Sequence, residues 1–163
     1  MVGAAEARPV SAEAHRELSD FLYGVCLSMD AREFKDWLDV CAEDFVYTIA
    51  AWSPEIRKEV TFLDLDLEGL TTLVKQLPRH NTDQSAFTRH MSVYAIEEIG
   101  DGLYAAISSV AIYRTELDGG TTRLFALGRY HDRIRRAPGG LRLVARSLRL
   151  ETRNLGIGTH YPL

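Results

Sequence analysis

The chain has 163 residues, of which 46% are hydrophobic and 26% charged, a composition typical of a globular protein. At this length we expect a single domain over residues 1–163 that buries roughly two thirds of its surface. The formal net charge of −4 argues against nucleic acid as a partner, because phosphate binding depends on clustered Lys and Arg. The N-terminal region has no apolar run long enough for a signal peptide or membrane span, so we expect a cytoplasmic protein with no membrane partner.

The first third of the chain predicts two helices after a short arm. Residues 1–10 lack periodicity and are expected to form a flexible or docked arm. Ser11 is a suitable N-cap for an amphipathic helix that ends near Met29. Asp30 and Glu33 have the spacing of a capping box, which predicts that Asp30 opens a second helix. Its inward face would hold four residues: Phe34, Trp37, Leu38 and Cys41.

Two cysteines, Cys26 and Cys41, fall in these predicted helices. Neither has a CxxC partner or a histidine at ligand spacing. Buried thiols in a reducing compartment are therefore expected, and metal or redox chemistry is not.

The middle of the chain predicts short elements. The β-forming residues 45–51 predict a strand, which the proline of Trp52-Ser-Pro-Glu would end. Residues 59–65 predict a second short strand, and residues 68–76 an amphipathic helix. Residues 78–86 are polar and irregular, which predicts a surface loop.

Residues 88–152 contain four long β-type runs separated by glycine-containing turns, which predicts an antiparallel meander. Alternation places His90, Ser92, Tyr94 and Ile96 on one face and Met91, Val93 and Ala95 on the other. A glycine in the third run, Gly128, predicts a bulge or bend, and a change of phase within residues 141–150 predicts a further bulge. Since neither face is purely polar, we expect helices on one face and a partner or second copy on the other. The apolar residues 153–163 are expected to form a docking tail.

Motifs for cofactor chemistry are missing from the sequence. It has no glycine-rich phosphate loop, HExxH, GxSxG or paired-cysteine motif. The five histidines lack the spacing of a non-haem iron site or a Rieske cluster. We therefore expect neither a metal nor a cofactor in this chain.

One acid/base pocket is conceivable. Asp30, Tyr47 and His90 could converge inside a cone-shaped fold, where a carboxylate beside an imidazole would set its tautomer and raise its pKa. The competing interpretation makes His90 a hydrogen-bonded structural residue. His131, in an arginine-rich strand end, and His160, in the tail, are weaker candidates. The arginines themselves predict a solvated face or an interface with an acidic partner.

Five segments of the chain resemble, in order, the β subunits of ring-hydroxylating dioxygenases. FLYGVCLSMDAREFKDWLDVCAEDFVYTIA is similar to the helical opening of that family, and TRHMSVYAIEEIGDG to its strand that begins Thr-Arg-His. VAIYRTEL, FALGRYHDRIRR and LRLVARSLRLET match its remaining strands. The resemblance covers about Ser19 to Leu155.

This resemblance implies an α+β fold of the scytalone dehydratase and nuclear transport factor 2-like superfamily. In that fold a strongly curved antiparallel sheet, packed on N-terminal helices, forms a cone-shaped barrel. The family's β subunits are structural and lack a cofactor, and a homotrimer of them forms the base of a hexamer with three α subunits. Each α subunit carries a Rieske [2Fe–2S] cluster and a mononuclear iron. The implied function is to support assembly of the α subunit of an oxygenase for aromatic compounds or small sulfonates.

The same superfamily contains stand-alone enzymes, so a SnoaL-like dehydratase, isomerase or cyclase is the alternative. By resemblance, Asp30, Tyr47 and His90 match positions of the scytalone dehydratase pocket. That enzyme uses a second histidine on the following strand, where this chain has Ser108 and Ser109. The missing second base favours the structural subunit.

Overall fold

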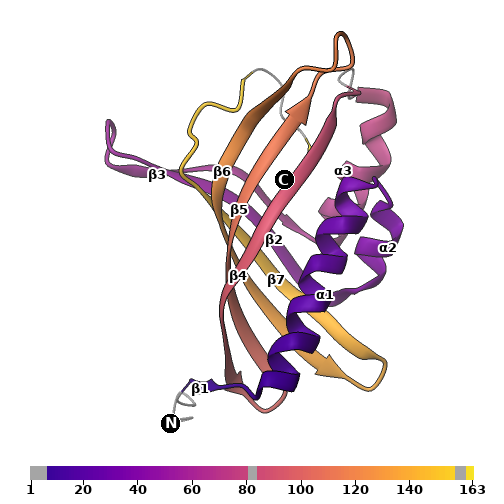
Figure 1. Cartoon of the computed structure of the whole chain (residues 1–163), viewed down its shortest axis with the longest axis vertical. Coiled ribbons are helices and arrows are strands. Elements are labelled where there is room, and N and C mark those ends of the chain that lie inside the picture. The colour runs from indigo at the N-terminus through magenta and orange to yellow at the C-terminus, as the bar shows by residue number, and fades with distance from the viewer. Residues whose placement is uncertain (1–6, 81–83, 157–160) are drawn as a thin grey trace.

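Three helices and seven strands make up the fold in a computed structural model that describes residues 7–80, 84–156 and 161–163 (Figure 1). In chain order they are β1 (Arg8–Pro9), α1 (Ala12–Asp30), α2 (Phe34–Asp39), β2 (Cys41–Ser53), β3 (Lys58–Asp66), α3 (Leu67–His80), β4 (Ala86–Gly100), β5 (Leu103–Thr115), β6 (Thr122–Ala137) and β7 (Gly140–Leu150).

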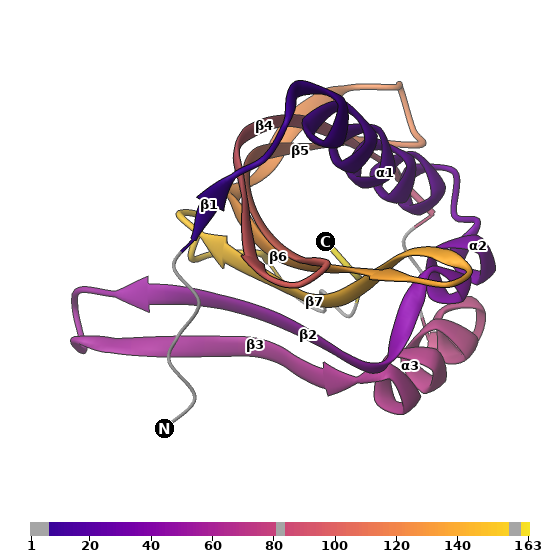
Figure 2. The same ribbon diagram turned by 90° about the horizontal axis from the view of Figure 1, so that it is seen from below.

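All seven strands form one sheet in the order β1-β4-β5-β6-β7-β2-β3. The predicted meander β4–β7 is confirmed, but the sheet is mixed, because β2 pairs with β7 in parallel. It is also unclosed, since β1 and β3 are its two edges. Figure 2 shows the sheet bent around an interior that the three helices close from the other side. The prediction of a strongly curved sheet packed on helices is confirmed, whereas a purely antiparallel barrel is wrong.

The first helix begins as predicted, and the second does not. Ser11 accepts a hydrogen bond from the backbone amide of Ala14 and caps α1. Asp30, however, is the last residue of α1, and α2 begins after Glu33 without a side-chain cap. The predicted capping box is therefore wrong, because the Asp30 carboxylate bonds to β4 across the interior instead.

The boundaries of β2 and α3 also differ from the prediction. Cys41 opens β2 and is not helical, since α2 already ends at Asp39. α3 continues through Pro78 to His80, where a loop was predicted. Proline is tolerated there because it removes a backbone bond only in the last turn. Residues 81–83 of the predicted loop lie outside the described residues.

The N-terminal arm docks where it is described. Arg8 and Pro9 pair with Glu98 and Glu97 of β4, and the Arg8 guanidinium lies 3.3 Å from the Glu98 carboxylate. Residues 1–6 of the arm are outside the described residues. Among the described residues, no helix is long and apolar enough to cross a bilayer.

Bulges set which side chains point into the bend. The pairing of β4 with β5 shifts at Tyr94, so Ile96 points inward while His90 points outward, and the predicted common face for these two is wrong. The pairing of β6 with β7 shifts at Val144, which confirms the predicted bulge in the last strand. This shift brings Arg146 onto the inner face.

Gly128 of β6 lies tightly against the backbone of β7. A bulge or bend was predicted at Gly128, and strand pairing shows no shift there, so the bulge is absent. A Cβ atom at this position would lie 2.4 Å from the carbonyl oxygen of Arg149 and 3.0 Å from the Cα of Leu150. The strand contact itself therefore requires glycine.

Gly128→Ala should lower the free energy of unfolding by about 1–3 kcal/mol, because backbone must move to admit the methyl group. Gly24→Ala is the matched control: a Cβ there meets nothing within 4 Å on an exposed face of α1. That change should stabilise the helix by about 0.5–1 kcal/mol. Urea unfolding of both variants measures the difference, and equal stabilities would contradict the close approach.

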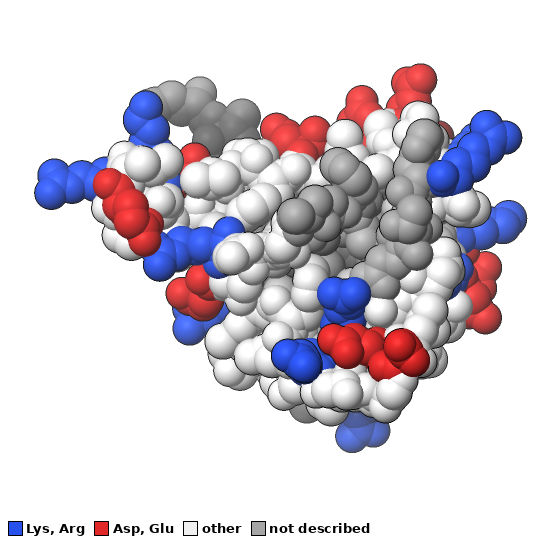
Figure 3. All heavy atoms as spheres, turned by 90° about the horizontal axis from the view of Figure 1, so that it is seen from above, with Lys and Arg blue, Asp and Glu red and all other residues white. Residues whose placement is uncertain are grey.

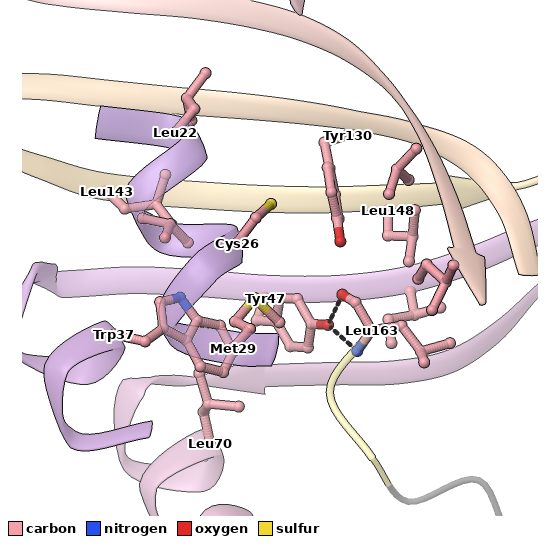
Figure 4. Packing of buried hydrophobic residues seen from close by; sticks show 14 of the residues in the cluster. Leu22, Cys26, Met29, Trp37, Tyr47, Leu70, Tyr130, Leu143, Leu148 and Leu163 are labelled. Atoms are coloured by element: carbon pink, nitrogen blue, oxygen red, sulfur yellow. Dashed lines mark hydrogen bonds between the residues drawn. The ribbon is translucent and has the colours of Figure 1, made fainter. Parts of the chain in front are cut away.

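The core fills the bend between helices and sheet (Figure 4). Trp37 of α2 and Tyr47 of β2 are fully buried and meet edge to face with ring centroids 5.7 Å apart. Leu18, Leu22 and Met29 of α1 are also fully buried. Most charged side chains lie at the surface, where acidic and basic groups are interspersed on the face shown in Figure 3, but Arg89, Asp132 and Arg146 are buried.

Candidate functional site

The interior of the bend contains the chain's own C-terminal segment. The Tyr47 hydroxyl donates to the carbonyl oxygen of Leu163 at 2.6 Å and accepts from the Leu163 amide at 2.8 Å (Figure 4). Tyr161 is buried and stacks on Phe87 with ring centroids 5.1 Å apart. Leu155 of the tail is also buried. The docking predicted for the apolar tail thus takes place on the protein's own core.

Arg89 ties this segment to the first helix. Its guanidinium bonds to the Asp30 carboxylate and, at 2.8 Å, to the carbonyl oxygen of Pro162. The Arg89 backbone amide also donates to Asp30 at 2.9 Å. The Arg89 side chain is fully buried, whereas that of Asp30 keeps 21% exposure. Asp30 and Tyr47 therefore both face the interior, and both are occupied by structural partners.

His90 lies on the opposite face of the sheet. It is exposed, and its ring meets Tyr113 edge to face at 5.2 Å between centroids. The predicted convergence of Asp30, Tyr47 and His90 is wrong at His90, because alternation along β4 turns Arg89 inward. Phe87 is apolar and lies two residues before Arg89. Alternation counted from Phe87 would have placed Arg89, and not His90, on the inward face.

A second ion pair lies deeper in the interior. Arg146 of β7 makes two hydrogen bonds to Asp132 of β6, at 2.8 and 2.9 Å, and both side chains are fully buried. The guanidinium also lies over the ring of Tyr130, 4.0 Å from its centroid. Burial lowers the pKa of Arg146, but the charge and hydrogen bonds of Asp132, together with Cys26 and Tyr130, outweigh it, so this pKa lies well above its usual value. The pair is a permanent structural element at neutral pH.

The remaining interior groups are held in their neutral forms. Burial raises the pKa of Tyr130 to about 12, opposed by the nearby charge of Arg89. Burial likewise raises the pKa of Cys41 to about 12 and also raises that of Cys26. A reactive thiol has a depressed pKa, so neither cysteine has the properties of a nucleophile.

The other candidate histidines do not complete a site. His131 is half-buried on the outer face of β6, and burial together with Arg149 lowers its pKa. His160 lies outside the described residues. Within the described ranges, no group of three or more His, Cys, Asp or Glu side chains is arranged to hold a metal ion. Five cavities at the surface of the described chain are lined by none of Asp30, Tyr47 or His90.

The candidate acid/base groups of the interior therefore have structural partners. The interior carboxylates bind buried guanidinium groups, and the best-placed hydroxyl binds main-chain atoms of the tail. General acid/base chemistry needs a titratable group within hydrogen-bond reach of a substrate. Here the hydrogen-bonding atoms of Arg89 and Tyr47 are occupied by the backbone of Pro162 and Leu163.

Comparison with known proteins gives the family. A family model described as a SnoaL-like domain matches residues 10–147. The chain is 37% identical over 150 residues to the methanesulfonate monooxygenase hydroxylase subunit beta of Methylosulfonomonas methylovora, an alignment that covers 87% of this chain and 83% of the relative. It is 30% identical over 146 residues to the 2-aminobenzenesulfonate 2,3-dioxygenase subunit beta of an Alcaligenes species, with 90% and 97% covered.

A solved structure has the same fold. It is a β subunit assigned to an aromatic-ring-hydroxylating dioxygenase of Novosphingobium aromaticivorans, with a TM-score of 0.78, 20% identity and coverage of 91% of this chain and 95% of that one. At this identity the likeness concerns the fold alone, and the two closer sequence relatives carry the assignment. The chain belongs to the SnoaL-like domain family and, within it, to the β subunits of ring-hydroxylating oxygenases.

Proposed function

We propose that this chain is the non-catalytic β subunit of an oxygenase that acts on a sulfonate, and that it supports a catalytic α subunit. The observation that carries the proposal is the 37% identity to the methanesulfonate monooxygenase β subunit over most of both chains. The second relative is the β subunit of another sulfonate oxygenase. On this proposal the α subunit carries a Rieske cluster and a mononuclear iron.

The assembly we propose is a cytoplasmic hexamer built on a trimer of this chain. The outer face of the sheet supports it, because this face exposes large apolar side chains on three neighbouring strands. Tyr94 is 63% exposed, Leu127 43% and Ile107 38%. Exposed apolar side chains grouped on one face are typical of interaction surfaces.

The stand-alone dehydratase, isomerase or cyclase finds less support. It needs Asp30, Tyr47 and His90 around one substrate, and His90 is on the far side of β4. The Tyr47 hydroxyl is already bound to both the amide and the carbonyl of Leu163.

The proposal predicts that the chain binds an oxygenase α subunit from its own organism. With a tag on this chain only, co-expression should yield a complex whose visible spectrum shows iron–sulfur absorption, while the chain expressed alone should be colourless. The co-expressed untagged α subunit alone is the control for non-specific retention. A tagged chain that never retains an α subunit would contradict the proposal.

A further inference from the structure

Three basic side chains form a row on the outer face of β6. Arg129, His131 and Arg133 occupy alternate positions, so successive members are about 7 Å apart along the strand. Arg149 of β7 lies directly opposite Arg129. Like charges directly opposite each other destabilise a sheet. The row therefore offers a favourable site for negative charge from a partner.

The chain supplies little of that charge itself. Arg149 has Glu59 at 3.5 Å, but Arg129 and Arg133 make no ion pair with any other described residue. The pKa of His131 is lowered by burial, then by the charge of Arg149 and, to a smaller extent, by that of Arg129. The contributions of the two arginines reflect the same excess of positive charge. Only Asp132 opposes it, and that carboxylate is committed to the interior.

The basic row borders a groove that also has an apolar part. The groove has a volume of about 600 Å³. Its lining includes the basic Arg129, His131 and Arg149, the acidic Glu59 and Glu151, and Trp52, which is 59% exposed. Arginine and tryptophan are the residue types enriched at the energetic centres of protein interfaces. This combination fits a protein surface that brings carboxylates.

A matching acidic row lies on β3, the edge strand of the sheet opposite β1. Asp64 and Asp66 are exposed at alternate positions, opposite Thr48 and Val46 of β2. Their spacing along the strand is the same, about 7 Å. Asp66 uses one oxygen to accept from the Gly69 amide, and neither aspartate forms an ion pair with a described residue.

We propose that the Asp64–Asp66 row of one copy of this chain docks on the Arg129–Arg133 row of the next copy. The inference rests on the proposed trimer and names the contact that holds it together. The two rows are different patches on different strands of a bent sheet (Figure 2), so in a head-to-tail arrangement each copy offers one row to a second copy and the other row to a third. Head-to-tail contacts close into rings such as trimers. The partner supplies the negative charge that the basic row lacks.

The test is charge reversal in the full chain. Arg129→Asp with Arg133→Asp should raise the dissociation constant of self-association by about tenfold or more, measured by light scattering over a concentration series. Asp64→Arg alone should have the same effect and leaves the α3 cap at Asp66 in place. Combining all three changes should restore part of the assembly, because Asp64→Arg returns an opposite charge across the contact while Asp66 stays acidic.

Arg16→Asp with Lys75→Asp is the matched control, since both residues are exposed on the helices and away from the sheet. It should leave self-association unchanged, and circular dichroism should show all variants folded.

Assembly unaffected by reversal, or no rescue in the combined variant, would overturn the inference. Loss of α-subunit binding with intact self-association would overturn it too, because the basic row would then bind the α subunit. Failure of the proposed function is distinct: the chain would still self-associate through these rows but bind no α subunit.

Discussion

Replacing Asp132 with Asn should lower the free energy of unfolding by about 3–5 kcal/mol, because it leaves the Arg146 guanidinium charged, buried and without its counter-ion. Asparagine keeps the shape of the side chain, so the loss measures charge rather than packing. Both partners are fully shielded from water. Equilibrium unfolding in urea, monitored by tryptophan fluorescence, gives the value directly.

The matched control is Asp44→Asn. Asp44 also makes a two-bond pair with an arginine, Arg135, at 2.8 and 3.1 Å, but these side chains are 59% and 44% exposed. Solvent screens such a pair, and its loss should cost no more than about 1 kcal/mol. Similar losses in the two variants would show that the Asp132–Arg146 pair is not buried as described.

Arg89→Met should be the second most damaging change, costing about 2–4 kcal/mol, because it leaves Asp30 and the Pro162 carbonyl without their common donor. It should also free the tail. The Leu163 amide, which bonds to the buried Tyr47 hydroxyl, should then exchange its proton much faster. Hydrogen exchange followed by NMR measures this loss of protection alongside the unfolding free energy.

His90→Ala is the control, since it removes an adjacent side chain from the outer face of the same strand. It should change the stability of the isolated chain by less than about 0.5 kcal/mol. If His90→Ala proved more damaging than Arg89→Met, the assignment of the two side chains to opposite faces would be wrong.

Local patterns predicted most elements of this fold. The helical periodicity after Ser11 held, and the phase change predicted within residues 141–150 marked a real bulge. These features depend on neighbouring residues in the chain, so the sequence carries them directly. The parallel pairing of β2 with β7 has no local signal, because it joins strands about a hundred residues apart.

The candidate site shows the same limit. Asp30 and Tyr47 were correctly recognised as inward residues, but their partners come from β4 and from the tail. The pattern Asp30-x-x-Glu33 favoured a local cap, and the buried Arg89 offered the carboxylate a stronger, charge-assisted partner. A single-residue error in the phase of β4 then exchanged Arg89 for His90. Short-range rules locate side chains on elements, and only the assembled sheet decides which of them meet.

We propose that this chain acts only as a component of a larger oxygenase. The direct measurement is sulfonate-dependent oxygen consumption by the α subunit with its electron-transfer partners, assayed with and without this chain. We expect turnover with the complete assembly, little with the α subunit alone, and none with this chain alone. Full activity of the α subunit in its absence, or turnover of a hydroxy or carbonyl substrate by this chain alone, would contradict the claim.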